Sequence, residues 1–334
     1  MIAKASAKAL KGRNAITLRR LRTGAGLAVT VGLLLTPGSA PAATLSVNGS
    51  TLVYRASPGE KDSFFPTYRR NRDFYWVQAD YPPFVTPGPS CSKGADSDRP
   101  HHTNDSGSPV QILSCPAAGV GVADVQLGDG DDKMGIQRDE NYRADGEHDQ
   151  ALLPVHRIVV HADGGPGNDV IAAELFADIL LGGPGNDNVN ALGGNDLIRG
   201  GPGRDIGHGG QGSDRIYGGS GADYLAGQAH RDRIYGESGN DRINGGGFSQ
   251  EKDRADSIYG GSGADTLTDF QNGKETAGDR FSGGAGNDQI DDRDGNRDII
   301  DCGAGRDSVL ADTRDKIARN CERVQRKFRP PGVR

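Results

Sequence analysis

The feature that most constrains this chain is an aspartate that returns at every ninth position. The run begins at Asp169 and continues unbroken for eight steps to Asp241. The register then makes two longer jumps, from Asp241 to Asp256 and from Asp265 to Asp279. Each jump is one nine-residue unit carrying an insertion, of six and five residues respectively, and each is followed by another step of nine. The regular members are Asp169, Asp178, Asp187, Asp196, Asp205, Asp214, Asp223, Asp232, Asp241, Asp256, Asp265, Asp279 and Asp288, and less regular steps lead to Asp298, Asp307 and Asp315.

An apolar residue follows these aspartates at the second position. The series is Ile171, Leu180, Val189, Ile198, Ile216, Leu225, Ile234, Ile243, Ile258, Leu267, Phe281, Ile290, Ile300, Val309 and Ile317. The one break in the regular run is Gly207 after Asp205, where Ile206 is displaced by one position. Glycine-rich stretches are often flexible linkers, but a linker has no reason to keep large aliphatic residues in a fixed phase.

Glycines fill the positions before the aspartates. A full Gly-Gly-x-Gly begins at Gly164, Gly182, Gly200, Gly209, Gly218, Gly260 and Gly283. The unit is therefore GGxGxDxUx, where U is a large aliphatic residue, which is the nonapeptide of calcium-binding parallel β-helices. Of the 52 glycines, 35 lie between Gly164 and Gly305, and Asp outnumbers Glu by 37 to 8. Helical bundles and doubly wound sheets are excluded, because no long apolar period survives this much glycine. Collagen is excluded because its period of three is missing.

The spacing predicts an all-β fold, a parallel β-roll. Six residues of Gly and Asp make a turn, and three residues make a short strand whose central side chain points inward. Two units close one coil, and successive coils stack as parallel strands about 4.8 Å apart. The thin aliphatic core alone is too small to offset the ordering entropy of the glycines, and stacked aspartates repel one another. A divalent cation between the turns relieves both problems. Calcium is favoured because it accepts six to eight oxygen ligands, whereas magnesium demands strict octahedral geometry.

These motifs resemble the hemolysin-type, or repeats-in-toxin (RTX), calcium-binding family over residues 164–315. The whole chain also resembles stand-alone exported calcium-binding proteins of bacteria. The shared features are the opening TLSVNGSTLVYRASPGE, the stretch QLGDGDD before the repeats and the closing IIDCGAGRDSVLADTRDKIARNCERV. The resemblance implies that each ion lies between two turns on the same side of the roll, two units apart. It would be held by aspartate carboxylates and by carbonyl groups of the glycine-rich turns.

Carried onto this sequence, the resemblance implies the following metal-site residues: Gly164, Gly167, Asp169, Gly182, Gly185, Asp187, Asp196, Gly200, Gly203, Asp205, Gly209, Gly212, Asp214, Gly218, Gly221, Asp223, Asp232, Gly239, Asp241, Gly260, Gly263, Asp265, Gly283, Gly286 and Asp288. No catalytic residue and no organic cofactor is implied.

The two sides of such a roll are unequally supplied with glycine. One side takes the turns of Asp169, Asp187, Asp205, Asp223 and Asp241, and four of these five carry the full Gly-Gly-x-Gly. The other side takes the turns of Asp178, Asp196, Asp214 and Asp232, of which only that of Asp214 is complete. We therefore expect good sites along the first side and poor or empty sites along the second near Asp178. Asp256 and Asp279 lack glycine turns, so family sites at the insertions are doubtful.

The segment 1–42 has the pattern of a secretory signal peptide. Residues 1–22 carry seven basic residues and no acid, an apolar stretch runs from Gly24 to Leu35, and Ala40 and Ala42 occupy small-residue cleavage positions. The alternative is a membrane anchor, but the apolar stretch is short of the roughly 20 residues that span a bilayer. We expect a secreted protein without a membrane span. Its mature part has 45 acidic and 32 basic residues, a net negative charge that argues against nucleic-acid binding.

The expected organisation is a signal peptide (1–42), an irregular β N-terminal cap region (43–160), the RTX β-roll (161–315) and a C-terminal cap with a basic tail (316–334). LSVNGSTLVYRA, from Leu45 to Ala56, is typical of a hairpin. Four cysteines allow three pairings, and the two local ones, Cys91–Cys115 and Cys302–Cys321, are favoured in an exported protein. A small separate domain with its own ligand is the alternative interpretation of residues 43–160.

No enzyme is predicted, because the chain has neither an HExxH motif nor a GxSxG motif. The prediction is calcium binding by an exported roll that folds on calcium and has a structural or binding role outside the cell. Two alternatives stay open: a secreted hydrolase or polysaccharide-modifying enzyme with the roll as an appendage, and a calcium-dependent adhesin that binds cell-surface or matrix glycans. Tyr217, Tyr235 and Tyr259 share one position of the repeat and should stack as an outward ladder, by cross-strand packing rather than as a sugar-binding strip.

Overall fold

The computed structural model describes residues 43–48, 51–56, 63–69, 74–79, 86–87, 91–93, 111–116, 122–135, 137–138, 158–246, 255–269 and 278–326. All of them belong to one compact unit, Ala42–Arg334. The predicted signal peptide, most of both repeat insertions and the end of the basic tail lie outside the described residues.

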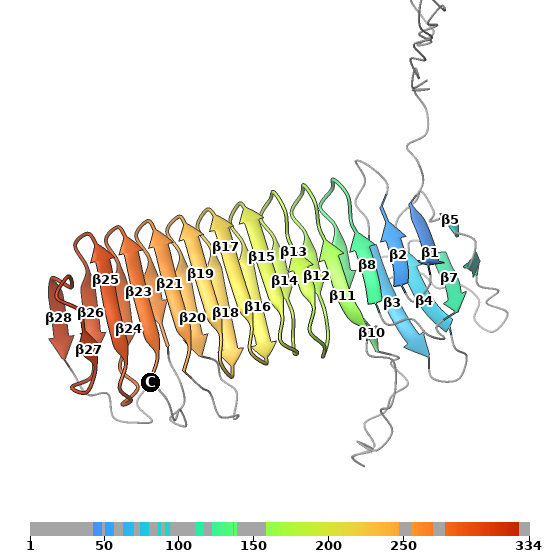
Figure 1. Ribbon diagram of the computed structural model, residues 1–334. Coiled ribbons are helices and arrows are strands. Elements are labelled where there is room, and N and C mark those ends of the chain that lie inside the picture. The colour runs from blue at the N-terminus through green and yellow to red at the C-terminus, as the bar shows by residue number, and fades with distance from the viewer. Residues whose placement is uncertain are drawn as a thin grey trace, which may run out of the picture. The chain divides into compact units, whose positions relative to one another are not determined.

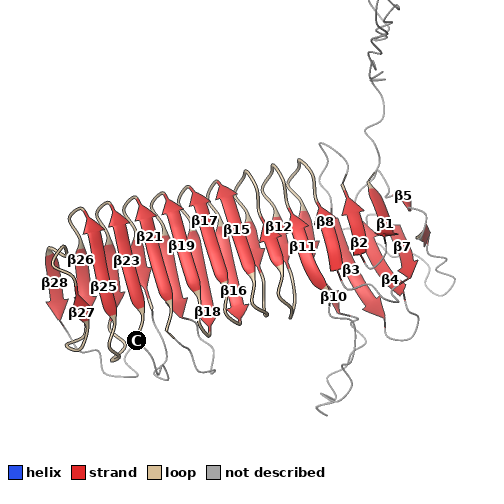
Figure 2. Cartoon of the chain, viewed as in Figure 1, coloured by secondary structure: helices blue, strands red, loops and turns tan. Residues whose placement is uncertain are grey.

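The described residues form strands, turns and bends without a helix, as Figure 2 shows. The predicted all-β parallel β-roll is confirmed: strands lie side by side in chain order in two sheets (Figure 1). The roll strands of the first sheet are β8 (Val122–Gln126), β11 (Val159–Asp163), β13 (Ile179–Leu181), β15 (Leu197–Pro202), β17 (Arg215–Ser220), β19 (Arg233–Ser238), β21 (Ser257–Ser262), β23 (Arg280–Ala285), β25 (Ile299–Ala304) and β27 (Lys316–Ile317). Those of the second sheet are β9 (Lys133–Gly135), β12 (Val170–Ala172), β14 (Asn188–Asn190), β16 (Ile206–Gln211), β18 (Tyr224–Ala229), β20 (Arg242–Gly246), β22 (Thr266–Thr268), β24 (Gln289–Asp292), β26 (Ser308–Ala311) and β28 (Arg323–Arg326).

The sheet register follows the sequence period. Ile198 of β15 pairs with Ile216 of β17, and Val189 of β14 pairs with Gly207 of β16, so each strand lies beside the strand two repeat units further on. The two insertions leave this register intact, because Ile234 still pairs with Ile258 and then with Phe281. Since the insertions lengthen turns rather than strands, the stack continues through them.

The core is the row of inward aliphatic side chains that the sequence predicted. From Ile171 to Val309 every member of that series is at most 2% exposed, while Ile317 at the end is only partly buried. At Gly207, which interrupts the series, an added Cβ would contact Leu225, Ile216 and Ile198, so neighbouring side chains occupy that space. The inward side chains of the two sheets thus form one continuous core along the described part of the roll.

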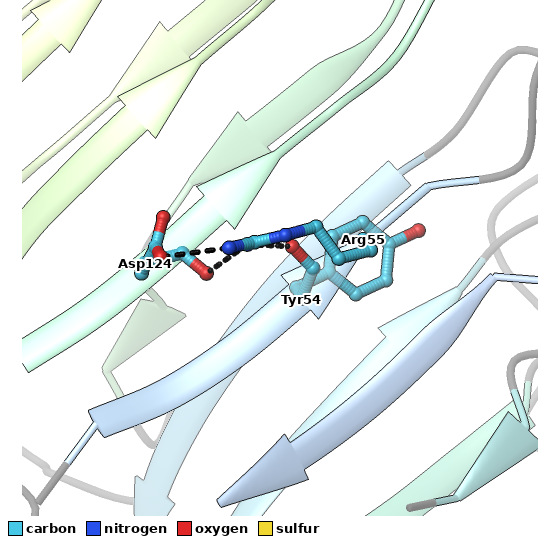
Figure 3. A network of polar contacts seen from close by, with 3 residues as sticks. All are labelled: Tyr54, Arg55 and Asp124. Carbon is cyan, nitrogen blue, oxygen red and sulfur yellow. Dashed lines mark hydrogen bonds and ion pairs between the residues drawn. The ribbon is translucent and has the colours of Figure 1, made fainter. Parts of the chain in front are cut away.

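The parallel stack begins before residue 161, where the sequence placed the start of the roll. The predicted hairpin forms, because β1 (Thr44–Asn48) pairs antiparallel with β2 (Thr51–Arg55). Strand β2 then runs parallel to β8, which runs parallel to β11. Arg55 donates a 2.8 Å hydrogen bond to the Asp124 carboxylate and also bonds the Tyr54 carbonyl oxygen, which ties β2 to β8 (Figure 3). The N-terminal strands therefore extend both sheets of the roll.

The remaining N-terminal strands continue the second sheet or flank the first. Strand β3 (Ser63–Arg69) pairs parallel with β9 and antiparallel with β4 (Phe74–Ala79), which pairs with β7 (Gln111–Pro116). Short strands β5 (Thr86–Pro87), β6 (Ser92–Lys93) and β10 (Gln137–Arg138) pair with β1, β7 and β3. Cys91 is disulfide-bonded, and the side chain of its predicted partner Cys115 lies outside the described residues.

The stack also runs past residue 315, through β27 and β28. The predicted Cys302–Cys321 disulfide is present and joins β25 to the segment that precedes β28. On the outer face of the first sheet, the predicted tyrosine ladder forms: the Tyr235 ring stacks on those of Tyr217 and Tyr259 at centroid distances of 4.9 and 4.8 Å. No helix in the described part of the chain is long and apolar enough to cross a membrane.

Candidate metal centre

The aspartates of the repeat form two ladders, one along each edge of the roll. We call the turns that lead from the first sheet to the second the first edge, and the turns that lead back the second edge. On the first edge, the Asp187 N–H donates a 2.8 Å hydrogen bond to Oδ1 of Asp205, and the Asp205 N–H does the same to Oδ1 of Asp223. On the second edge, Asp178 and Asp196 donate in the same way to the aspartates of the next coil. One carboxylate oxygen of each aspartate therefore orders the stack.

The second carboxylate oxygen faces a different environment. In most members of both ladders, Oδ2 is buried and has no hydrogen-bond partner among the described residues. The atoms concerned belong to Asp169, Asp187, Asp196, Asp205, Asp214, Asp223, Asp241, Asp265, Asp288, Asp298 and Asp307. A buried carboxylate oxygen without a donor carries a large desolvation cost. Its repetition at the same place in successive coils indicates a cation-binding position.

On the first edge, from Asp169 to Asp288, a glycine five residues before the aspartate shapes the space around its Oδ2. A Cβ built on Gly200 would lie 2.5 Å from Asp205 Oδ2 and 2.6 Å from the carbonyl oxygen of Gly218 in the next coil. Glycine at this position therefore leaves an oxygen-lined cradle that any side chain would fill. The same pair of oxygens, from its own aspartate and from the next turn, borders Gly164, Gly182, Gly218, Gly236 and Gly260.

Two further glycines of each turn are required by the stacking of the backbone. Gly201 and Gly203 have φ values of +117° and +147°, a region that residues with a side chain rarely adopt. A Cβ on either would overlap with a carbonyl oxygen of the preceding coil. The Gly-Gly-x-Gly pattern thus combines one glycine that opens the cradle with two that allow close backbone contact.

Burial makes these carboxyl groups weak acids when no cation is present. It raises the pKa of Asp205 to about 7 and that of Asp196 to about 8, with smaller increases from the neighbouring carboxylates and an opposing effect of the backbone hydrogen bond. The pKa values of Asp169 and Asp241 rise to about 7 for the same reason. A hard divalent cation that accepts carboxylate and carbonyl oxygens would hold these groups ionised, and calcium fits this all-oxygen set.

The edges differ in the residue that occupies the cradle position. On the first edge, every such position from Gly164 to Gly283 is glycine. On the second edge, the β-sheet register aligns Ala173, Ala191, Gly209, Gly227, Gly245, Asp269, Asp292 and Ala311. Ala173 and Ala191, both buried, place a methyl group where the first edge has an open cradle. The aspartate ladder itself is equally regular on both edges, and it includes Asp256 and Asp279 despite their missing glycines.

The structure thus brings all the predicted aspartates into two ladders, and the predicted glycines into the turns beside them. The metal-site residues implied by the resemblance do not include Asp132 and Asp307, which extend the first-edge ladder at its two ends. Asp132 is the last residue of the GDGDD stretch, which is a degenerate form of the calcium-binding turn. The implied residues also omit Asp269, which follows β22, and Asp292, which ends β24. Their signal is an acid at the position where the remaining units have Gly or Ala.

Comparison with known families agrees with this geometry. The chain matches the model of the RTX calcium-binding nonapeptide repeat (4 copies) over residues 163–198, 199–229, 217–249, 253–268 and 276–309. These segments are RTX calcium-binding repeats. The RTX β-roll is a structural calcium-binding domain and not an enzyme family. A search of curated proteins finds no significant match to the chain.

Proposed function

We propose that this RTX roll binds calcium between successive turns and acquires its full order only with the ion bound. The observation that carries the proposal is the row of buried aspartate Oδ2 atoms on the first edge from Asp169 to Asp288, each beside a glycine and near a carbonyl oxygen of the next coil. The ligands would be the carboxylates of Asp169, Asp187, Asp205, Asp223, Asp241, Asp265 and Asp288 with the carbonyl groups of their glycine turns. Bound calcium supplies the positive charge that keeps these buried carboxylates ionised.

The chain's own residues perform the rest of the binding. Each backbone N–H of a ladder aspartate orients the carboxylate of the next coil, so Oδ2 is directed toward the cradle before an ion arrives. The aliphatic core keeps the two sheets together and excludes water from the inner side of the turns. Glycine at the cradle position leaves the space that the ion would fill.

The proposed setting is outside the cell, where the protein has a structural or binding role. Export is supported by the signal-peptide pattern of residues 1–42 and by the disulfide Cys302–Cys321, a bond typical of oxidising compartments. Extracellular modules bind calcium with dissociation constants of about 10⁻⁴ to 10⁻³ M. External calcium would then stabilise the roll by mass action, whereas the low cytosolic level would not.

Circular dichroism of the mature chain, residues 43–334, tests the calcium proposal directly. We expect a β-sheet spectrum in millimolar calcium, its loss or marked weakening in EDTA, and recovery when calcium is restored. A magnesium-only sample serves as the control for ionic strength and should resemble the EDTA sample. An unchanged spectrum and melting temperature after chelation would refute the proposal.

A further inference from the structure

Four carboxyl groups gather at the second edge, close to the C-terminal end of the roll. They belong to Asp292 at the end of β24, to Asp294 and Asp298 in the connection to β25, and to Asp279 in the turn before β23. One carboxylate oxygen from each lies within 4.8 Å of those of the other three. No Gly-Gly-x-Gly turn is present here, because the connection reads Asp-Arg-Asp-Gly-Asn-Arg-Asp from Asp292 to Asp298. The cluster is therefore built from side chains where the regular sites use backbone carbonyl groups.

Asp292 is the residue that distinguishes this cluster from ordinary surface acids. Its register partner is Ala311, and it occupies the cradle position that is glycine or alanine in every other second-edge unit except that of Asp269. The side chain is completely buried, and neither carboxylate oxygen accepts a hydrogen bond from an N–H or hydroxyl group of the described residues. Its close polar neighbour is the carboxyl group of Asp298. A fully buried acid that faces other acids, without a donor, requires either a proton or a cation between them.

Two nearby arginines form their hydrogen bonds outside the cluster. Arg293 forms two 2.6 Å hydrogen bonds with the outward carboxylate of Asp291. Arg314 donates to the carbonyl oxygen of Gly295. Asp294 accepts hydrogen bonds from the backbone and side chain of Asn296, which fixes its orientation at the rim of the cluster. Burial, with the other carboxylates next in importance, raises the pKa of Asp292 well above its ordinary value.

We propose that Asp279, Asp292, Asp294 and Asp298 form a further divalent-cation site, distinct from the RTX turns, whose protein ligands are side-chain carboxylates. The preferred ion is calcium. Zinc is disfavoured because the four groups include no histidine or cysteine. Magnesium is disfavoured because it retains much of its water and binds through few carboxylates, whereas calcium accepts several carboxylates in flexible geometry.

Such an ion would connect three consecutive parts of the stack. Asp279 precedes β23, Asp292 ends β24, and Asp298 precedes β25, the strand that carries Cys302. The site would therefore hold a turn that lacks the glycine pattern in the same stacked position as the regular turns. Asp269, also fully buried, occupies the equivalent cradle position one coil earlier. An acid therefore occupies this position in two successive coils of the second edge.

The test compares Asp292→Asn with Asp291→Asn in the mature chain. Asn is close to isosteric with Asp but removes the charge, and Asp291 is a neighbouring acid outside the cluster. We expect the Asp292→Asn protein to bind one calcium ion fewer than wild type, measured by equilibrium dialysis and elemental analysis. Its melting temperature should fall in calcium and rise in EDTA, because the substitution removes a ligand in the first case and a buried repulsive charge in the second. Asp291→Asn should bind as many ions as wild type.

An unchanged ion count for Asp292→Asn would overturn the inference. If that variant does not fold, Asp294→Asn, at the half-buried rim, decides by the same ion count. The ion counts also distinguish a failure of the new site from a failure of the proposal that the RTX turns bind calcium. A wild-type chain that binds several ions and loses none in these variants refutes only the new site. A chain that binds a single ion, lost in Asp292→Asn, refutes the RTX-turn proposal and supports the new site.

Discussion

The two edges of the roll share an aspartate ladder but differ in what stands beside it. On the first edge, glycine leaves an open cradle at each regular turn, and on the second edge the same position passes from alanine to glycine and then to aspartate. The hydrogen bonds between Asp178 and Asp196 are as short as those between Asp187 and Asp205. The ladder is therefore a stacking feature common to both edges, and our proposal is that the open cradle distinguishes the turns that bind calcium from those that do not.

The largest expected effect is the pH dependence of the calcium-free roll, which the two edges should share. Burial raises the pKa of Asp187 and Asp178 to about 6, and that of Asp196 to about 8. A pKa raised in the folded state contributes stability below the unfolded value near 4, and that contribution is lost as pH rises through about 6 to 8. Each unit of upward shift corresponds to about 1.4 kcal/mol. In EDTA the melting temperature should therefore be higher at pH 5 than at pH 8.

Calcium reverses this dependence, since protons compete with the ion for the same carboxylates. In saturating calcium, thermal unfolding should occur at higher temperature at pH 8 than at pH 5. A calcium-free roll that gains stability as pH rises would show that the ladder carboxylates are not destabilised by burial. Asp178→Asn and Asp187→Asn should raise the melting temperature in EDTA by similar amounts, because the ladder environment is common to both edges.

The next largest effect should come from removing ligands on one edge only. Asp187→Ala with Asp205→Ala is matched by Asp178→Ala with Asp196→Ala on the second edge, where Ala173 and Ala191 occupy the cradle positions. We expect the first pair to lose more calcium ions per chain, as measured by titration calorimetry. An ion at a free concentration of 100 times its dissociation constant contributes about 2.7 kcal/mol. Equal losses from the two pairs would contradict the proposed difference between the edges.

A smaller effect should follow from exchanging the cradle residue itself. Gly200→Ala would place a methyl group 2.5 Å from Asp205 Oδ2 and 2.6 Å from the Gly218 carbonyl oxygen. Overpacking of this kind costs about 1–3 kcal/mol. It should also remove an ion from the count obtained by equilibrium dialysis. Ala191→Gly is the reciprocal variant, and it should leave the count unchanged or add one ion. Retention of every ion in Gly200→Ala would show that the cradle is not the binding position.

The smallest effect is expected on the sheet face, away from both edges. Tyr235→Ala breaks the stack with Tyr217 and Tyr259, and aromatic pairs of this kind contribute about 0.5–1.5 kcal/mol beyond the area that they bury. The loss should be equal in calcium-loaded and calcium-limited samples, because the rings lie on the outer face and take no part in either ladder. The free energy of unfolding is measured by chemical denaturation. A decrease found only in the calcium-loaded protein would show that the tyrosine stack on the sheet face is coupled to the calcium-binding turns.

The period of nine determined most of the fold in advance, because one aliphatic and one aspartate per unit decide which side chain points inward and which turns stack. The period therefore predicted the two sheets and the row of inward side chains from Ile171 to Val309. The Cys302–Cys321 bond was predicted separately, from the local pairing of cysteines in an exported chain. The sequence placed the start of the roll at residue 161, and parallel pairing already occurs at β8 and β9, which lack a full glycine turn. It also missed Asp292, because its significance depends on register with Ala311 across the sheet, which no local pattern reveals.

The Cys302–Cys321 bond affects the order in which the coils of the roll unfold and refold. In a stack of this kind each coil contacts only its neighbours, so stability is close to a sum of coil and interface contributions. A free terminal coil has one interface instead of two and unravels first. Here the last coil is closed covalently, so a chain stripped of calcium retains a tethered end against which the next coil can reassemble. When calcium returns, the coils would then refold one after another, starting from the disulfide-bonded C-terminal coil.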